Sequence, residues 1–243
     1  NDPKLGEFRI SANIQNATFA YVPRSLQPPQ SLPWPAVTNM SGELVVERTR
    51  LQVNQARAQL GGRSALQVSK ATGLIATLDD NPTVVVELEA KGPMADMLGY
   101  VKGSPVASMI GPALDQATGT GKADLRVKLN LPLAAIEKSG VQGSVTLNDN
   151  DLQFSADSPR LTRARGVVNF SEVGFSLSAA QARMLGGDMR LEGGTVQTGT
   201  ANGGSGATSA PIIVLRAEGG VTAEGLRQAK ELSFLARLAP HAS

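Results

Sequence analysis

Apolar and polar residues alternate strictly along much of this 243-residue chain. Every second residue is apolar from Phe8 to Ile14, from Leu125 to Leu129 and from Val145 to Leu147. Successive side chains of a β-strand point to opposite faces, so this period of two predicts strands with one buried face. A polar break at 48–50 separates two such strands. We therefore expect about a dozen strands, joined mainly as antiparallel hairpins.

The same strand-rich pattern occurs twice. Gly42 and Gly166 lie 124 positions apart, as do Pro35 and Pro159, and the Gly pairs at 61–62 and 186–187 lie 125 apart. Ile14 and Phe19 match Leu147 and Leu152 at a spacing of 133, so the length differences fall in loops. We expect two repeat units, 1–115 and 116–243, that share one continuous sheet.

Each unit is expected to continue from hairpins into helix. Helical signals run from Pro93 to about Val101 and from Thr222 to about Leu238, and a shorter segment spans 106–114. The Gly/Ser/Thr-rich stretch 198–209 predicts a flexible loop in the second unit. Further turns are expected where Asn and Asp gather, at Asn16, 79–82 and 148–150.

The number of strands exceeds what the expected helices can cover. Each strand presents a row of Val, Leu, Ile or Phe, and short helices can bury only part of such a face. The predicted fold is therefore mainly β with a few short helices, an elongated antiparallel sheet curled into a groove. A closed sandwich packed with its own side chains is the alternative. An open groove would be a binding surface, because large exposed apolar patches mark interaction sites.

Composition narrows the class of protein. Hydrophobic residues make up 41% and charged residues 18%, a globular balance, whereas aromatic residues make up only 4%. The net charge of +2 is too small to predict a nucleic-acid partner. Cysteine is absent, which fits an oxidising compartment, and no apolar run approaches the ~20 residues of a membrane-spanning helix. Because the chain begins at Asn1, we expect a processed chain or a piece of a larger protein.

Catalytic and metal-binding chemistry find little support in the sequence. The single histidine, His241, lies two residues from the end, and no Ser-His-Asp or Cys-His set can be assembled. Gly119-Thr-Gly121-Lys122 lacks two defining residues of a phosphate loop and predicts a strand entry. Asn148-Asp-Asn-Asp151 could suggest calcium, but a hairpin turn is favoured. We expect no enzyme, no metal and no cofactor.

A basic run carries Arg160, Arg163 and Arg165 at nearly alternate positions. This spacing predicts arginines on one face of a strand, where a solvated outer surface is the favoured interpretation. Contact with anionic lipid headgroups is the alternative.

Several of these segments resemble the AsmA-like family of Gram-negative bacteria, and within it the YhdP-type periplasmic region. The resemblance rests on Phe8 to Ile14, Phe19 to Pro23, Trp34-Pro35, Gly42 to Leu44 and Leu60 to Gly62. In the second unit it rests on 147–152, 159–161, 166–170 and 185–187. It implies a bridge-like lipid-transfer protein whose β-hairpin units form a taco-shaped groove. It also implies an inner-membrane anchor outside this chain and phospholipid traffic across the periplasm to the outer membrane.

The predicted function is a non-enzymatic periplasmic segment of a lipid-transport bridge. Its partners would be phospholipid, the remaining segments of a larger protein, and both membranes through regions outside this chain. A closed β-repeat module that acts as a spacer or protein-docking unit is the alternative, and an enzyme acting on envelope polymers is a weaker third. The expected acyl-chain lining comprises apolar positions shared by both units: Leu44, Val46, Leu51, Val53, Val168, Phe170, Phe175 and Leu177.

Overall fold

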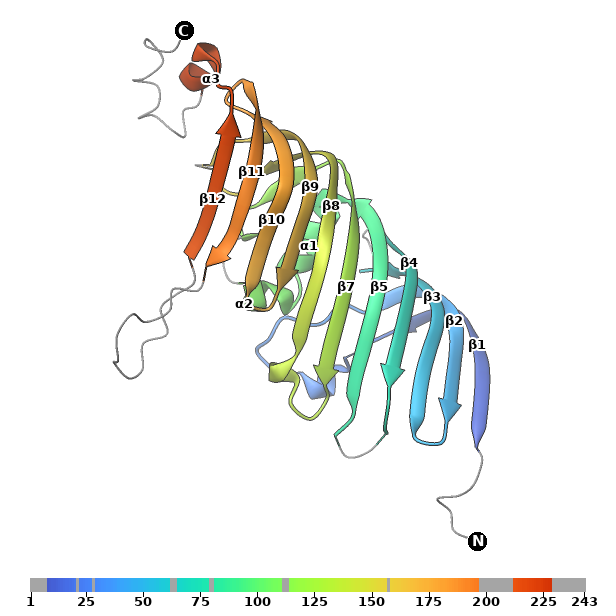
Figure 1. Ribbon diagram of the computed structural model, residues 1–243. Helices are drawn as coiled ribbons and strands as arrows, with labels where there is room; N and C mark the ends of the chain where they lie inside the picture. The colour runs from blue at the N-terminus through green and yellow to red at the C-terminus, as the bar shows by residue number, and fades with distance from the viewer. Residues whose placement is uncertain are drawn as a thin grey trace, which may run out of the picture.

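The described part of the chain forms one open antiparallel sheet of twelve strands (Figure 1). The computed structural model describes residues 8–20, 22–27, 29–61, 65–78, 81–110, 114–156, 158–196 and 212–228. The sheet does not close on itself, so the expectation of an open antiparallel sheet is confirmed and the closed alternative is wrong. The strands are β1 (Arg9–Phe19), β2 (Val37–Glu47), β3 (Arg50–Leu60), β4 (Leu66–Ile75), β5 (Thr83–Pro93), β6 (Thr118–Thr120), β7 (Lys122–Pro132), β8 (Gly140–Gln153), β9 (Leu161–Ser171), β10 (Gly174–Met184), β11 (Gly187–Val196) and β12 (Ile212–Gly219).

Strand order in the sheet follows the order of the chain. Eleven strands pair in sequence from β1 to β12, and the short β6 lies off this path and pairs with β8. The sheet passes directly from β5 to β7, although the helical segment lies between them in the chain. Consecutive strands are therefore neighbours almost everywhere, which the hairpin pattern of the sequence predicts.

The part of the chain that the structure describes contains three short α-helices beside the sheet. The helix expected at Pro93 to Val101 is α1, Met94–Lys102, and the segment expected at 106–114 contains α2, Val106–Ile110. The expected C-terminal helix begins as α3, Ala223–Gln228, and its remainder lies outside the described residues, as does the predicted loop at 198–209. Within the described residues, 3-10 turns occupy Arg24–Leu26 and Ile136–Lys138.

Six strands carry a β-bulge built on a residue in the left-handed region. A bulge inserts one extra residue, which lets the alternation of inward and outward side chains continue while the strand bends. These residues have φ between 49° and 68°, and each lies at a shift in strand register: Asn16, Asn39, Gln55, Asp149, Arg163 and Ala179.

Two of these bulges correct the sequence analysis. Turns were expected at Asn16 and at 148–150, but β1 runs through the first position and β8 runs unbroken from Gly140 to Gln153. The error has a physical cause, because Asn and Asp are favoured in the left-handed conformation that both turns and bulges use. The expected turn at 79–82 does fall between β4 and β5, with Asp79 and Asp80 outside the described residues.

The bulges recur at the spacings that relate the two expected repeat units. Asn39 and Arg163 lie 124 positions apart, as do Gln55 and Ala179, and Asn16 and Asp149 lie 133 apart. These are the spacings that align the apolar positions of the sequence. This match supports a duplicated unit, while the division at 115–116 stays a prediction.

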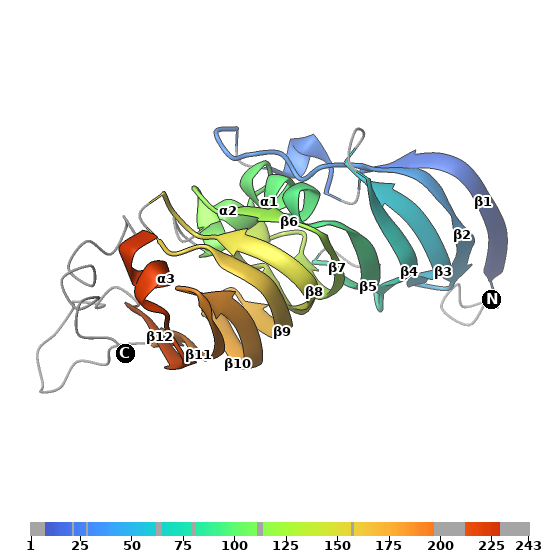
Figure 2. The same cartoon turned by 90° about the horizontal axis from the view of Figure 1, so that it is seen from above.

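The strands bend toward the side of the sheet that carries α1 and α2 (Figures 1 and 2). Two clusters of buried side chains lie on this side. The first core cluster joins Met94 and Met97 of α1 to buried residues of eight strands, including Leu66 and Ala180. The second joins Val22, Trp34 and α2 to β7 and β8. The core of the molecule therefore lies against one face of the sheet.

Candidate functional site

One face of the sheet is apolar across its whole width. Strand pairing places directly opposed residues on the same face, so a row of partners can be followed from strand to strand. One such row crosses nine strands, from β3 to β12, and every member is apolar or glycine: Ala58, Val68, Ala90, Leu125, Val145, Val168, Leu177, Gly193 and Leu215.

A second row extends the apolar face to the N-terminal edge. Ile10 of β1 opposes Val46 of β2, and the row then continues through β3, β4 and β5 to β7. Its members after Val46 are Leu51, Ile75, Val84 and Leu131. The face that carries these rows is called the apolar face below, and the opposite one the polar face.

The eight residues expected to line a groove all lie on the apolar face. They form four directly opposed pairs in two hairpins, β2–β3 and β9–β10, which are equivalent in the two expected repeat units. All eight are half-buried. The pairs are Leu44 with Val53, Val46 with Leu51, Val168 with Leu177, and Phe170 with Phe175. Their contact with lipid stays a prediction.

Protein atoms already pack against part of this set. Val168 and Leu177 lie against the first core cluster, and Phe170 lies against the second. The covering atoms come from α1 and α2 and from the segment that contains Val22 and Trp34. The middle of the apolar face is therefore partly covered by protein atoms. The sequence did not predict that the segment containing Val22 and Trp34 would contribute to this cover.

The two outer strands leave the apolar face open in the described part of the chain. Ile10 and Phe19 of β1 are 52% and 47% exposed, and Ile213 and Leu215 of β12 are 49% and 51% exposed. These side chains belong to the rows that are buried in the centre of the sheet. Apolar surface therefore remains accessible at both edges.

The polar face carries charged pairs across neighbouring strands. The Lys128 ammonium lies 2.8 Å from the Glu87 carboxylate, and Arg126 lies 3.7 Å from Glu89. The hydrogen bond from Lys128, together with its positive charge, holds the pKa of Glu87 below its ordinary value. All four side chains are about half exposed or more. The polar face is thus solvated at these pairs, whereas Val45 of β2 is buried on the same face.

An open depression of about 810 Å³ lies across β4 to β11. Its lining includes a block of residues that the strand register places on the polar face, among them Lys70, Arg126, Gln142 and Asn169. Phe170 and Phe175 also line it, although their side chains belong to the apolar face. We therefore assign this depression to the polar face, and it supplies no argument for the expected groove.

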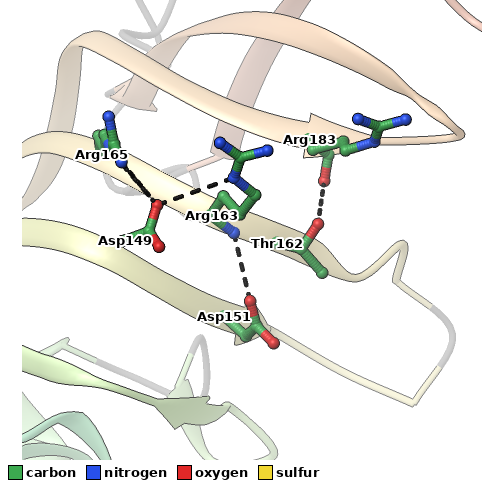
Figure 3. A network of polar contacts seen from close by, with 6 residues as sticks. All are labelled: Asp149, Asp151, Thr162, Arg163, Arg165 and Arg183. Atoms are coloured by element: carbon green, nitrogen blue, oxygen red, sulfur yellow. Dashed lines mark hydrogen bonds and ion pairs between the residues drawn. The ribbon is translucent and has the colours of Figure 1, made fainter.

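The basic run at 160–165 forms a network with two aspartates at the bulges of β8 and β9 (Figure 3). Arg165 and Arg163 approach Asp149 Oδ1 at 2.9 and 3.9 Å, and Arg160 approaches Asp151 at 3.4 Å. The three arginine side chains stay 61–65% exposed, as expected for a solvated outer surface. Asp149 and Asp151 thus face arginines rather than each other.

Two further motifs have structural surroundings in this fold. Gly119 to Lys122 spans the end of β6 and the start of β7, so the expected strand entry is confirmed. Among the described residues, no three His, Cys, Asp or Glu side chains gather in a way that could hold a metal ion. His241 lies outside the described residues. None of the helices that the structure describes has the length and apolar character needed to cross a membrane.

Fold and site together define an open, bent antiparallel sheet protein with one apolar face. A family model described as YhdP protein matches residues 1–239, so the chain belongs to the YhdP family. The resemblance noted in the sequence is thereby confirmed. No solved structure matches the chain significantly.

A curated relative adds a functional description. A protein of Escherichia coli (strain K12) described as intermembrane phospholipid transporter YhdP is 26% identical over 167 residues. The match covers 68% of this chain and 12% of that relative. The name of that relative describes a transporter of phospholipid between membranes, and the chain spans 12% of its length.

Proposed function

We propose that this chain is a non-enzymatic, periplasmic segment of a lipid-transport bridge that holds phospholipid acyl chains against its apolar face. The observation that carries the proposal is the continuity of that face, because apolar rows cross every strand of the main path from β1 to β12. The YhdP family and the phospholipid transporter among its relatives support the choice of ligand.

The physical driving force is the removal of hydrocarbon from water. Each CH₂ group that leaves water gains about 0.8 kcal/mol, so an apolar path lowers the barrier to moving a lipid through an aqueous compartment. Leu44, Val46, Leu51 and Val53 are our first candidates for this contact, because none of them is packed against either buried cluster. Phe175 is a fifth candidate, because it is not packed against either buried cluster.

The chain acts, in this proposal, as one part of a longer structure. It spans 12% of the length of the transporter that it matches. The remaining segments would continue the sheet beyond β1 and β12, where the described part of the sheet ends. Regions outside this chain would reach the two membranes, with the anchor in the inner membrane.

The buried clusters favour a second candidate function. Met94, Met97 and Trp34 pack on the middle of the apolar face and reduce the surface that is available to a lipid. A spacer or protein-docking segment that binds no lipid would show this packing too. The two functions differ in whether lipid accompanies the purified protein.

Lipid capture by site-specific photo-crosslinking tests the proposal. A photoreactive residue at Leu51 or Phe175 on the apolar face should capture phospholipid in bacteria, detected by mass spectrometry of the purified chain. The matched controls are Arg50 and Ser176, which neighbour these positions on the polar face. Equal capture on both faces, or no phospholipid in an organic extract of the purified chain, would refute a lipid-holding face and leave the spacer function.

A further inference from the structure

Three arginines pair with two aspartates on the polar face near the ends of β8 and β9, and a fourth arginine, Arg183 of β10, lies beside them. Arg165 Nη2 and Nε donate to Asp149 Oδ1 at 2.9 and 3.2 Å, and the Arg163 backbone N–H donates to Asp151 Oδ1 at 3.2 Å. The Arg183 side chain donates to the Gly186 carbonyl at 3.1 Å, and its own carbonyl accepts a hydrogen bond from Thr162. Figure 3 shows the guanidinium groups of Arg163, Arg165 and Arg183 on the same side of the strands.

The aspartates hold three of these arginines in place without using all of their donors. A guanidinium group has five N–H donors. Arg160 uses one of them and Arg165 uses two in hydrogen bonds to aspartate, and the Arg163 guanidinium forms an ion pair at 3.9 Å. Three arginines pair with the two aspartates, so these five side chains keep an excess of one positive charge at the exposed surface. Arg183 lies beside them and opposite Asp188 of β11. Arginines that are fixed in advance lose less entropy when they bind an anion.

The charges of this cluster are not needed to build the bulges. At the spacings that relate the two expected repeat units, Asn39, Ser41 and Gln59 stand where the second half has Arg163, Arg165 and Arg183. The bulge at Asn39 is bridged by a neutral hydrogen bond, from Asn39 Nδ2 to Gln59 Oε1 at 3.1 Å. Asn16 and Thr18 likewise replace the two aspartates. The same backbone therefore forms without charge.

We propose that this arginine cluster binds the phosphate groups of phospholipid headgroups at the surface of an anionic bilayer. One guanidinium group can donate two parallel hydrogen bonds to phosphate oxygens. Each basic residue near an anionic membrane also adds electrostatic attraction. The choice of a lipid as the source of the phosphate rests on the proposed function, whereas the position of the cluster does not.

Vesicle binding tests the proposal on the full chain. Unmodified protein should sediment with vesicles that contain phosphatidylglycerol and should not sediment with vesicles of phosphatidylcholine alone. A variant that carries the first-half residues, Arg163→Asn with Arg165→Ser and Arg183→Gln, should bind the anionic vesicles at least tenfold more weakly. Because its substitutions already occur in an equivalent bulge, it should keep the unfolding midpoint of the parent.

A second variant separates the cluster from net charge. Lys70→Gln with Arg126→Gln and Lys128→Gln removes three cations from another part of the polar face and should change vesicle affinity less than threefold. An equal loss in both variants would overturn the proposal. Displacement of the protein from the vesicles by inorganic phosphate, added at the concentration of the lipid phosphate, would also overturn the proposal. Photo-crosslinking at Leu51 should be the same in both variants, so failure here leaves the lipid-holding face untouched.

Discussion

Asn150 is a fully buried polar residue at the bulge of β8, and it ties three strands together. Its Nδ2 group donates to the carbonyls of Thr120 at 2.9 Å and Lys122 at 3.2 Å, and its Oδ1 accepts the Asn148 backbone N–H at 2.7 Å. These partners belong to β6, β7 and β8. The side chain satisfies backbone groups that the bulge removes from the regular ladder of strand hydrogen bonds.

Replacing this side chain should cost stability. We expect Asn150→Ala to lower the free energy of unfolding by about 1–3 kcal/mol, because it leaves buried hydrogen-bonding groups without their partner. Urea denaturation followed by circular dichroism measures the change. Asn130→Ala, at an exposed position of β7, is the matched control and should change the free energy by less than about 0.5 kcal/mol. Similar values for both variants would contradict the structural role of Asn150.

The ion pair of Glu87 predicts a pH dependence with a definite sign. The folded-state pKa of Glu87 is lowered, first by the hydrogen bond from Lys128 and then by its charge. The pair therefore stabilises the fold above the ordinary carboxyl pKa, and this contribution is lost as pH falls through the lowered value. We expect Lys128→Met to raise the pKa of Glu87 toward its ordinary value in an NMR titration. Arg126→Gln should leave that titration unchanged, and no rise in Lys128→Met would remove the assigned cause.

At the scale of single residues, the sequence identified the unusual positions but not their structural role. The cluster of Asn and Asp at 148–151 predicted a turn, and the structure has a bulge. One signal could have separated the two. Leu147 and Leu152 both point to the apolar face, although their odd spacing of five breaks strict alternation. A single extra residue within a continuing apolar pattern indicates a bulge, whereas a turn would begin a new pattern.

At the scale of elements, β10 offers a test of the bulges within one strand. Ala179 has φ of 52° and is exposed, whereas Ala182 in the same strand is buried. Ala179→Gly should stabilise the protein by up to about 1 kcal/mol, because glycine adopts the left-handed region without strain. Ala182→Gly should destabilise by about 1 kcal/mol through lost packing and added chain entropy. Thermal unfolding measures both, and the same sign for both variants would contradict the assigned bulge.

The strands were more predictable than their connections. Alternation between Phe8 and Ile14 and between Leu125 and Leu129 marked strands that the structure contains, because that pattern reflects burial on one face. The start of α1 was predicted to within one residue, since Pro93 is an unfavourable residue inside a helix. The packing of Trp34 and Val22 on the sheet was not predicted. It depends on contacts between distant segments, which a local pattern does not encode.

At the scale of the whole molecule, the described sheet ends in two edge strands, β1 and β12, each of which pairs with a neighbouring described strand on one side only. All residues of β12 are exposed, including Ile213 and Leu215 of the apolar face. Exposed apolar edge strands pair with other chains, so we expect the isolated chain to associate as concentration rises. Ile213→Lys with Leu215→Lys should reduce association severalfold in sedimentation velocity. Gln142→Lys with Ser144→Lys adds the same charge within the sheet, and an equal reduction there would contradict pairing through β12.

The overall shape followed from an imbalance that the sequence already showed. About a dozen strands with apolar rows present more apolar surface than a few short helices can cover. In agreement with this imbalance, the sheet is open and bent. The eight expected lining residues fall on one face because the two hairpins keep the same register. How far α1 and its neighbours fill that face could not be deduced, because helix placement over a sheet depends on the fit of individual side chains such as Met94 and Met97.

The bulges also determine how the shape of the sheet would change in a longer protein with more hairpins of this kind. Each bend is made inside a hairpin, by residues such as Gln55 and Ala179, and needs no contact with a distant part of the chain. A longer relative that added hairpins of this kind would gain one bend with each addition. Because each bend lies along its own strand, the bent sheet would lengthen in proportion to the number of hairpins, while the curvature of each strand would stay constant.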